Sequence, residues 1–291
     1  VCGPQLKNGF NVNHSSFAMS CHNAGVCGSS PGKHDMSEPI PVLGTMIYNR
    51  PDYLERMLRS IDYPVEKLII ILNAVTAEIA AIADLARTLH PGVIIHNPGF
   101  NQPKPVNLGF CGGWNWILKN HMADWVLVCG NDTQFLPGQM QKIAEYWDRH
   151  KNDSPPMGLV NTNYGWNIQG MTRAGLDVMG YLDLNLWPLY YEDCDINQRH
   201  TIARKQGLLS YPSEGECIIQ VHHEVSATSR ALPPEKAERM AKAFERNVEY
   251  YVRKWGGPQC HEQWEHPFNN PALSIRDWTL EPNRWELNSL D

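Results

Sequence analysis

The segment WVLVCGNDTQFLP, residues 125–137, carries the strongest indication of the fold. It begins with five apolar residues, Trp125 to Cys129, and turns polar at Gly130-Asn131-Asp132-Thr133. An uninterrupted apolar run of this kind is typical of a strand that is buried on both faces of a sheet. Ligands gather at the carboxyl ends of strands in open α/β sheets, so Asp132 is placed where an ion or a phosphate would bind. The alternative is an ordinary tight turn, in which Asn131 and Asp132 only cap the chain.

Three earlier apolar runs alternate with helical patterns. The runs cover residues 41–48, 67–73 and 92–99, apolar residues at helical spacing cover 52–61, and an Ala-rich helix is expected over 76–89. Strands that alternate with helices indicate a parallel sheet with right-handed crossover connections. The predicted fold class is therefore α/β, and the first half of the chain looks like a nucleotide-binding unit.

Length, composition and charge limit the classes to which this protein can belong. The chain has 291 residues, of which 42% are hydrophobic, and this is enough for a real core in one large domain or two small ones. A net charge of -6 without a long run of Lys or Arg argues against a nucleic-acid or anionic-membrane partner. No stretch approaches eighteen uninterrupted apolar residues, so no membrane span is expected in this sequence.

Six of the eight cysteines fall into two groups. Three of them lie in the first thirty residues, which are rich in Gly, Ser, Asn and His: Cys2, Cys21 and Cys27. This composition predicts an N-terminal extension, residues 1–38, tied by a disulfide, with a zinc site as the alternative. Three others lie in or beside apolar runs and are expected to be buried thiols: Cys111, Cys129 and Cys194. The cysteines leave both the secretory pathway and the cytoplasm open.

A glycine-rich segment, NLGFCGGWNWIL at 107–118, precedes the central strand. Its glycines at 109, 112 and 113 allow the backbone to approach a bulky group closely, and a helix is expected from the Trp-Asn-Trp segment to about His121. The segment matches neither the dinucleotide fingerprint nor the P-loop. The alternative is a close-packed turn before an amphipathic helix.

A second acidic cluster, Glu192-Asp193-Cys194-Asp195, follows the aromatic run 187–191. It opens a helix that is expected to end at Gly207. Acids in a first helical turn often only cap the helix and complement its dipole. The functional alternative is a general base, because burial among aromatic rings and neighbouring negative charges would raise the pKa of Asp193. Asp195 and Arg199, four residues apart, are expected to form a structural ion pair.

Four segments follow one another in a recognisable order. They read YNRP at 48–51, NLGFCGGWNW at 107–116, WVLVCGNDTQFLPG at 125–138 and LWPLYYEDCDINQR at 186–199, with KWGG at 254–257 as an outlying piece. This order and spacing resemble the inverting glycosyltransferases of family 2, especially their rhamnosyltransferase branch. The similarity extends over residues 39–229.

The resemblance implies a fold and an activity. The expected fold is GT-A, a Rossmann-like, mostly parallel sheet flanked by helices, over residues 39–257, with an irregular tail, 258–291, packed on it. The expected reaction moves a sugar from a UDP-, GDP- or dTDP-sugar donor, with inversion, to a hydroxyl group. The acceptor would be a glycan, a glycoconjugate or a small molecule.

Carried over by position, the resemblance assigns the chemistry. Asp132 would hold a divalent cation, Mn²⁺ or Mg²⁺, on the donor diphosphate. The first acidic position of this family motif is Gly130 here, a departure that weakens metal binding. His222, with His223 as the fallback, would complete the metal shell. Asp193 would be the catalytic base. Residues 131–133 also form a glycosylation sequon, and a glycan there would block the site.

Further residues are candidates for contact with the two substrates. Strand ends, glycines and polar groups would bind the nucleotide-sugar donor: Thr45, Tyr48, Arg50, Asn73, Gly112, Gly113, Asn131 and Lys254. Aromatic and acidic side chains would bind the acceptor: Trp187, Tyr191, Glu192 and Asp183. Such aromatics are just as often core residues, and a Lys at the end of a helix is usually solvated.

Two other functions are kept as alternatives. A nucleotidyltransferase on a related α/β sheet would need a basic, phosphate-binding loop after the first strand, where only Arg50 is available. A catalytically degenerate carbohydrate-binding protein is favoured by Gly130 at the first acidic position. A panel of nucleotide sugars would separate these alternatives from the glycosyltransferase.

Overall fold

A computed structural model of the protein describes residues 37–74, 76–98, 106–160, 166–210, 219, 221–224 and 227–287. All of these residues belong to a single unit, Ser37–Asp291. The predicted disulfide-linked extension, with Cys2, Cys21 and Cys27, lies outside the described residues. Within the described part of the chain, no helix combines the length and the apolar character that crossing a bilayer requires.

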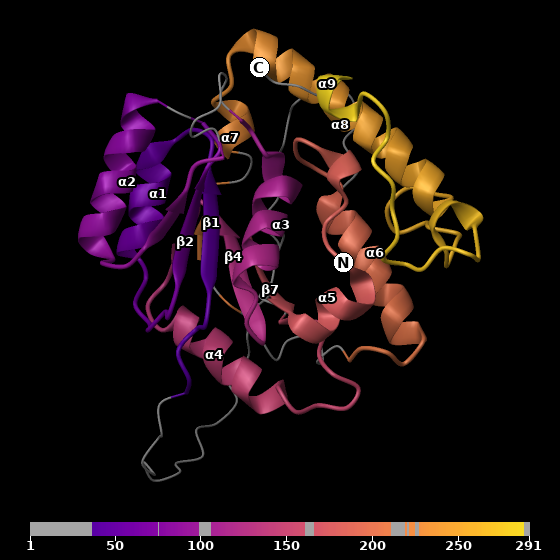
Figure 1. Ribbon diagram of the computed structural model, residues 1–291, viewed down its shortest axis with the longest axis horizontal. Coiled ribbons are helices and arrows are strands. Elements are labelled where there is room, and N and C mark those ends of the chain that lie inside the picture. Colours follow the sequence, from indigo (N-terminus) through magenta and orange to yellow (C-terminus); the bar gives the residue numbers. More distant parts are fainter. Residues whose placement is uncertain are drawn as a thin grey trace, which may run out of the picture. The chain divides into compact units, whose positions relative to one another are not determined.

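A mixed sheet forms the centre of this unit (Figure 1). In the described residues its strand order is β3-β2-β1-β4-β7-β6. The strands are β1 (Leu43–Ile47), β2 (Leu68–Leu72), β3 (Ile94–His96), β4 (Trp125–Gly130), β6 (Leu159–Val160) and β7 (Ile168–Thr172). The first four strands pair in parallel, whereas β7 is antiparallel to both β4 and β6. The expected α/β class with a mostly parallel sheet is therefore confirmed.

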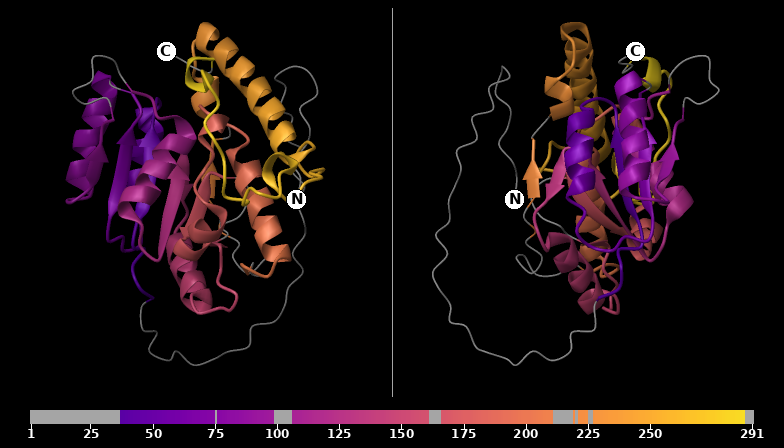
Figure 2. Two further views of the ribbon diagram at one scale, coloured as in Figure 1. Left: turned by 45° about the vertical axis from the view of Figure 1, so that its right-hand side comes forward. Right: turned by 90° about the vertical axis from the view of Figure 1, so that its left-hand side faces the viewer.

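Helices cover both faces of the sheet (Figure 2). One face packs on α1 (Pro51–Arg59), α2 (Ala77–Leu89) and α4 (Gln139–His150). The other face packs on α3 (Gly109–His121), α5 (Arg173–Met179), α6 (Glu192–Lys205) and α8 (Pro234–Trp255). Successive strand residues point to opposite faces, so Ile70 joins the first core and its neighbours Ile69 and Ile71 join the second. This is why the strands read as unbroken apolar runs.

Two regions differ from the sequence prediction. Helix α3 begins at Gly109 rather than in the Trp-Asn-Trp segment, so Gly112 and Gly113 lie inside the helix. Strand β7 (Ile168–Thr172), directly before α5, is not among the strands that the apolar runs predict. Strand β7 lacks an unbroken apolar run, since it includes the buried Gln169. Pairing with strands on both sides holds it in the sheet.

A small second sheet and the C-terminal tail complete the unit. Strand β5 (Thr133–Phe135) pairs antiparallel with β8 (Val221–His223). The short helix α7 (Ala227–Arg230) precedes α8, and the tail contains η2 (Pro267–Asn269) and α9 (Arg284–Leu287). The tail contacts the 3-10 helix η1 (Leu184–Leu186), because Glu281 N donates to Asn185 Oδ1 at 2.7 Å.

The described cysteines agree with the sequence prediction. Cys111, Cys129 and Cys194 are free and buried, as expected. Burial raises the pKa of all three thiols. Cys260, in the tail, is disulfide-bonded.

Candidate active site

Asp132 follows β4 directly, in the turn that leads into β5. Its Oδ2 lies 3.4 Å from Nε2 of His223, and the two side chains are 13% and 29% exposed. His223 pairs with Thr133 across the β5–β8 ladder, whereas His222 pairs with Gln134. Successive strand residues face opposite sides, so only one of the two histidines can face Asp132. The structure brings the fallback residue, His223, to Asp132 in place of His222.

Gly130 is required by the position of Asp132. A Cβ atom at residue 130 would lie 2.6 Å from Asp132 Oδ1, so the carboxylate folds back over the glycine. A side chain at residue 130 would therefore require the Asp132 carboxylate to move. Among the described residues, no group of three or more His, Cys, Asp and Glu side chains could hold a metal ion. Asp132 and His223 form a pair of potential ligands.

Asn131 has a structural role in the same turn. Its Nδ2 donates to the carbonyl oxygens of Asn49, at 3.2 Å, and Arg50, at 3.4 Å. The side chain is buried, and it ties the turn after β4 to the residues that follow β1. The nitrogen that a glycan would need is turned into the protein. Asn131, which was predicted to contact the donor, therefore also holds the turn.

Asp193 is the second residue of α6, and its environment raises its pKa. Burial is the cause of the increase, which a hydrogen bond from Cys194 N to Asp193 Oδ1, 2.8 Å, only partly offsets. The adjacent Glu192 is 5% exposed, and burial together with the charge of Asp193 raises its pKa well above the usual value. Within the described residues, Glu192 Oε2 has no hydrogen-bond partner. Two neighbouring carboxyl groups with raised pKa values are a common feature of functional sites.

Residues 187–191, here called the base loop, connect to the carboxyl end of the sheet on the α3 side. Phe110 N donates to the Pro188 carbonyl at 2.8 Å. Gly109 lies so close to Trp187 that a Cβ atom there would be 2.3 Å from the indole ring. Gly109 also lies beside the end of β2, because its carbonyl oxygen accepts a hydrogen bond from Asn73 Nδ2 at 3.2 Å.

A second set of contacts connects the base loop to the turn of Asp132. The Tyr190 hydroxyl hydrogen-bonds to the Ser229 hydroxyl of α7 at 2.8 Å. The carbonyl of the preceding Thr228 accepts from Asn49 Nδ2 at 3.2 Å. Asn49 in turn accepts from Asn131, next to Asp132. The base loop and the Asp132 turn are thus connected at the same end of the sheet.

Lys254 and Asp183 lie in a buried ion network rather than on a substrate surface. Lys254 Nζ is fully buried, 2.7 Å from Asp183 Oδ2 and 2.7 Å from Asp195 Oδ1. Asp195 also pairs with Arg199, which confirms the expected structural ion pair. Although burial acts to raise it, the pKa of Asp195 is lowered by these two cations. Lys254 was predicted to contact phosphate and Asp183 the acceptor, and in the structure each of these charges has a partner inside the core.

Three residues that were predicted to contact the donor, Thr45, Asn73 and Gly113, form packing contacts at the strand ends. Thr45 is fully buried, and its Oγ1 donates to the Cys129 carbonyl at 3.0 Å. Asn73 is also buried, and its Oδ1 accepts from Leu108 N at 3.2 Å, which fixes the start of α3. A Cβ atom on Gly113 would lie 2.7 Å from Met46 Cε. In the structure these groups pack β1, β2 and α3 together.

Gly112 has a similar packing role. A Cβ atom at this position would lie 3.1 Å from Leu108 Cβ, one turn earlier in the chain, and 4.0 Å from Leu184 Cδ2. A side chain at residue 112 would thus crowd Leu108 and would make an ordinary contact with Leu184 of η1.

Tyr48 and Arg50 remain partly exposed after β1. Arg50 has a left-handed backbone, φ 59°, and its guanidinium donates to Asp52 at 2.9 and 2.7 Å. Its charge is therefore already paired. The Tyr48 hydroxyl accepts from Lys236 Nζ at 2.9 Å. Lys236 was not predicted from the sequence, because a Lys in the first turn of a helix belongs to no recognisable motif.

The aromatic residues of the base loop are largely core residues. Trp187 is buried, and its ring centroid lies 5.2 Å from that of Trp285 in the tail. Tyr191 is half-buried and packs against Phe244 and Tyr251 of α8. Trp187, which was predicted to contact the acceptor, therefore exposes little of its ring. Tyr191 retains some exposed surface.

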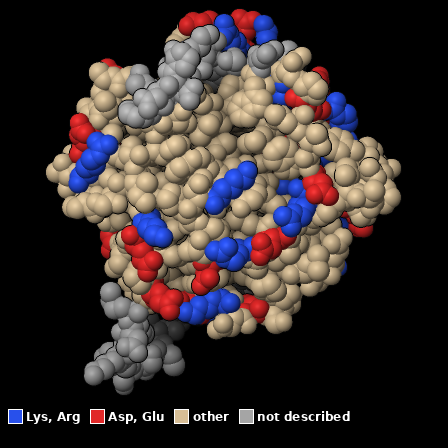
Figure 3. Space-filling view, viewed as in Figure 1, with Lys and Arg blue, Asp and Glu red and all other residues tan. Residues whose placement is uncertain are grey.

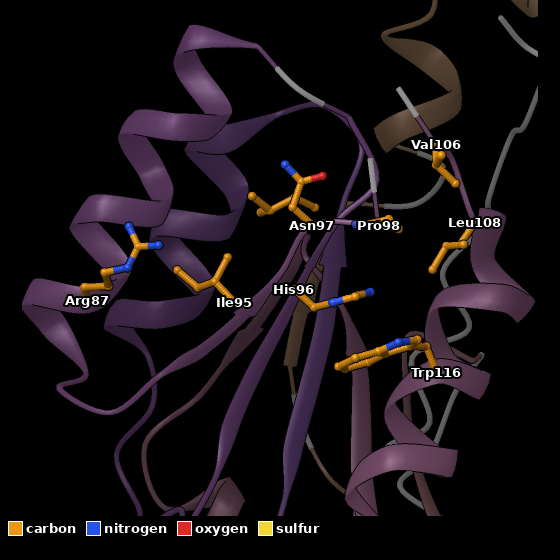
Figure 4. Close-up of a pocket in the computed structure, with 9 residues that line it drawn as sticks. Arg87, Ile95, His96, Asn97, Pro98, Val106, Leu108 and Trp116 are labelled. Carbon is orange, nitrogen blue, oxygen red and sulfur yellow. The ribbon is translucent and has the colours of Figure 1, made fainter. Parts of the chain in front are cut away.

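A pocket of about 810 Å³ lies where β2 and β3 end (Figure 4). The His96 ring stacks on Trp116 of α3, with centroids 3.8 Å apart and planes 11° apart. Nine described residues line the pocket: Leu72, Arg87, Ile95, His96, Asn97, Pro98, Val106, Leu108 and Trp116. Sequence reasoning placed a donor pocket at the ends of the first two strands, whereas this pocket lies at the second and third.

The fold is an α/β sheet with Asp132 in the turn after β4 and Asp193 in the first turn of α6. Residues 44–206, more than half of the chain, match the family described as Glycosyl transferase family 2. The chain belongs to this family, and it is a glycosyltransferase. Comparison with curated proteins returned no match.

Several solved structures are similar to this chain at low sequence identity. The mannosyltransferase PcManGT from Pyrobaculum calidifontis, in complex with GDP-Man and Mn²⁺, is 13% identical over 76% of this chain, with a TM-score of 0.49. This chain covers just under two thirds of it, 66%. TarS 1–349 from S. aureus is 14% identical over 72% of each chain, with a TM-score of 0.45. Glucosyl-3-phosphoglycerate synthase from Mycobacterium tuberculosis, with Mn²⁺, UDP and glucosyl-3-phosphoglycerate, is 12% identical over 76% of this chain and 82% of that chain, with a TM-score of 0.47.

Proposed function

We propose that this glycosyltransferase moves a sugar from a nucleotide-sugar donor to a hydroxyl group with inversion, using Asp193 as the base. The observation that carries the proposal is the set of contacts that connects the Asp132 turn to the base loop through Asn49 and α7. This set of contacts supports one site with an acid for each half of the reaction. Asp132 serves the leaving group, and Asp193 serves the incoming hydroxyl.

Asp193 takes the proton of the acceptor hydroxyl while that oxygen attacks the anomeric carbon. The bond from this carbon to the diphosphate oxygen breaks on the opposite side, so the configuration inverts. A raised pKa makes the Asp193 carboxylate a stronger base than a solvated one. Tyr191, beside the start of α6, and the buried Glu192 are the remaining candidates for acceptor contact.

Asp132 and His223 fit a divalent cation such as Mn²⁺. Both side chains are accessible, their nearest atoms are 3.4 Å apart, and they offer one carboxylate and one imidazole. A bound cation would neutralise the charge that develops on the departing diphosphate. The two protein ligands leave most of the coordination shell to donor oxygens and water. Metal binding is therefore expected to be weak without donor.

The pocket at the ends of β2 and β3 is the proposed place of the donor nucleoside. It lies at the carboxyl ends of parallel strands, the end at which α/β sheets bind nucleotides. Its lining combines apolar and aromatic side chains with the polar Asn97 and Arg87, which suits a planar base. Tyr48 and Lys236 lie at the end of the neighbouring β1, where Lys236 could contact phosphate oxygens.

The proposal is tested with a panel of UDP-, GDP- and dTDP-sugars in a thermal-shift assay, with and without Mn²⁺. A ligand at one hundred times its Kd stabilises the folded state by about 2.7 kcal/mol. One donor class is expected to stabilise the protein, more strongly with Mn²⁺ than without it. Including dTDP-rhamnose tests the finer prediction of a rhamnosyltransferase-like enzyme.

Turnover separates the enzyme from its alternatives. With the donor class found in the panel, release of nucleoside diphosphate is measured with a set of sugar acceptors. Asp193→Asn is expected to lower this release at least a hundredfold and to leave donor stabilisation unchanged. Equal turnover in Asp193→Asn would remove Asp193 from its role. Release of inorganic pyrophosphate from a nucleoside triphosphate would favour a nucleotidyltransferase, and stabilisation by sugars alone would favour a binding protein.

A further inference from the structure

We propose that Asn247 and Arg284 are positioning residues for Asp193, acting through the base loop. The inference rests on the proposed function, because it concerns the base assigned there. Asn247 lies in the middle of α8, and Arg284 opens α9 in the C-terminal tail. Neither residue is close to Asp193 in sequence, and neither belongs to the motifs that indicate the family.

The base loop has an unusual backbone just before the base. Tyr190 and Tyr191 both have positive φ angles, 79° and 75°. Residues other than glycine rarely adopt this left-handed conformation, and two in succession are rarer still. Such a conformation persists only where the surrounding structure holds it. Helix α6 begins at the next residue, so the loop determines where Asp193 lies.

Asn247 supplies the hydrogen bonds that hold this loop. Its side chain is fully buried, and its Nδ2 donates to the carbonyl oxygens of Leu189, at 3.0 Å, and Tyr190, at 3.1 Å. One amide group thus binds two successive carbonyls. Buried carbonyl groups left without donors would be unfavourable, so this contact favours the observed loop conformation.

Arg284 fixes the orientation of the Asn247 amide. Its Nη2 donates to Asn247 Oδ1 at 2.8 Å. A guanidinium can only donate, so the amide oxygen must face Arg284 and the amide nitrogen must face the loop. Arg284 is itself held in place, with Nε 2.6 Å from the Asn185 carbonyl and Nη2 3.0 Å from the Arg246 carbonyl. A lysine could not form this planar set of bonds.

The tail therefore acts on the first turn of α6. Asp195 N donates to the Tyr191 carbonyl at 3.0 Å, so the last residue of the base loop closes the turn that carries Asp193. Loss of the Asn247 amide would let Tyr190 and Tyr191 relax and would move the Asp193 carboxylate. The Asp132–His223 pair lies on other strands and would stay in place. Turnover should fall while donor binding persists.

The substitution Asn247→Asp tests this with little change of volume, because it replaces the donating nitrogen by an oxygen. With the donor identified by the panel, kcat is expected to fall at least tenfold while the donor KM changes less than threefold. The acid limb of the pH profile should move to lower pH. Burial raises the pKa of Asp193, and a loosened loop would expose the carboxylate and lower that pKa. The carboxylate that Asn247→Asp introduces would by itself raise the pKa of Asp193, so a shift to lower pH reports the loosened loop.

Hydrogen exchange gives a readout that does not depend on turnover. Amides in a peptide covering residues 187–195 are expected to exchange at least tenfold faster in Asn247→Asp, with exchange in β1 and β2 unchanged. Arg284→Lys should produce a smaller effect of the same kind, and it serves as the second variant if Asn247→Asp does not fold. A surface substitution on α8 is the control: Lys242→Ala, which removes an exposed pair with Glu238.

The outcomes separate this inference from the proposed function. Unchanged exchange in residues 187–195 of folded Asn247→Asp and Arg284→Lys would overturn the inference, whatever the activity. Faster exchange with unchanged kcat and pH profile would also overturn it, because the loop would then not position the base. If the wild-type protein used no donor, the proposed function would fail, and the exchange data would still decide whether Asn247 holds the loop.

Discussion

Gly130 shows how one residue can set the position of a functional group. Because Asp132 Oδ1 occupies the space of a Cβ atom at residue 130, the missing acid of the family motif is linked to the geometry of the acid that remains. Sequence alone identified Asp132 and noted the departure at Gly130. It could not show that the carboxylate folds back over the glycine, since this depends on the turn between β4 and β5.

We expect Gly130→Ala to weaken donor and metal binding. The added methyl group would lie 2.6 Å from Asp132 Oδ1 and would force the carboxylate to move away from His223. In the thermal-shift assay, the additional stabilisation that Mn²⁺ gives with donor should be lost, as it should be in Asp132→Ala. Asp193→Asn is the comparison, because it should keep the metal effect. Full metal-dependent stabilisation in Gly130→Ala would show that the Asp132 carboxylate has room to move.

Glu192 gives a prediction for stability against pH. Its pKa is raised by burial, so the folded state holds its proton more tightly than the unfolded state does. For an acid with a raised pKa, stability is lost as the pH rises above the unfolded value. Glu192→Gln removes this cost. It should therefore stabilise the protein at pH 8.

Chemical denaturation at pH 8 and at pH 4 measures this effect. The difference between Glu192→Gln and the wild type should shrink toward pH 4, where the carboxyl group is protonated in both states. Glu224→Gln is a suitable control, because Glu224 is exposed and pairs with Arg230. A Glu192→Gln variant that is less stable at pH 8 would indicate that the carboxylate is bound by a charge partner.

At the scale of helices and strands, the buried ion network around Lys254 could be predicted only in part from the sequence. The i, i+4 spacing of Asp195 and Arg199 was enough to predict their pairing, and the structure confirms it. Lys254 is 71 residues from Asp183 in sequence, and no local pattern shows that α8 would bury its ammonium group between η1 and α6. The same limit applies to β7, which forms because β4 and β6 pair with it.

Lys254→Met is expected to destabilise the packing of α8 on α6. It removes the cation between Asp183 and Asp195 and leaves two buried carboxylates with less compensation. Breaking a buried ion pair on one side typically costs about 3–5 kcal/mol. Urea denaturation measures the loss. Lys242→Met, at an exposed i, i+4 pair on the same helix, should change stability by less than about 0.5 kcal/mol.

Donor binding by Lys254→Met distinguishes a role in the ion network from a role in phosphate contact. If Lys254 acts only in the network, donor stabilisation per folded molecule should be unchanged in Lys254→Met. A folded Lys254→Met variant that is as stable as the wild type but no longer binds donor would restore Lys254 as a phosphate contact.

At the scale of the whole molecule, the alternation of apolar runs and helical patterns was sufficient for the parallel part of the sheet. The site was only partly accessible to such reasoning, because its parts come from three distant regions. Asp132 follows β4, His223 ends β8, and Asp193 opens α6. The charges on the face shown in Figure 3 do not indicate where the site lies, since acidic and basic side chains are interspersed over its described part.

A ligand footprint tests whether these regions form one site. Nucleoside diphosphate with Mn²⁺ is expected to slow hydrogen exchange in residues 130–135 and 221–224, because both strands flank the Asp132–His223 pair. The base loop is connected to this turn through Asn49 and α7, so exchange in residues 187–195 should slow as well. Peptides of α4 are the internal control, since this helix covers the first core and is not among the elements linked to the site. Protection of the β5 and β8 peptides alone would place Asp193 outside the donor site, and a single-displacement reaction through that residue would then be excluded.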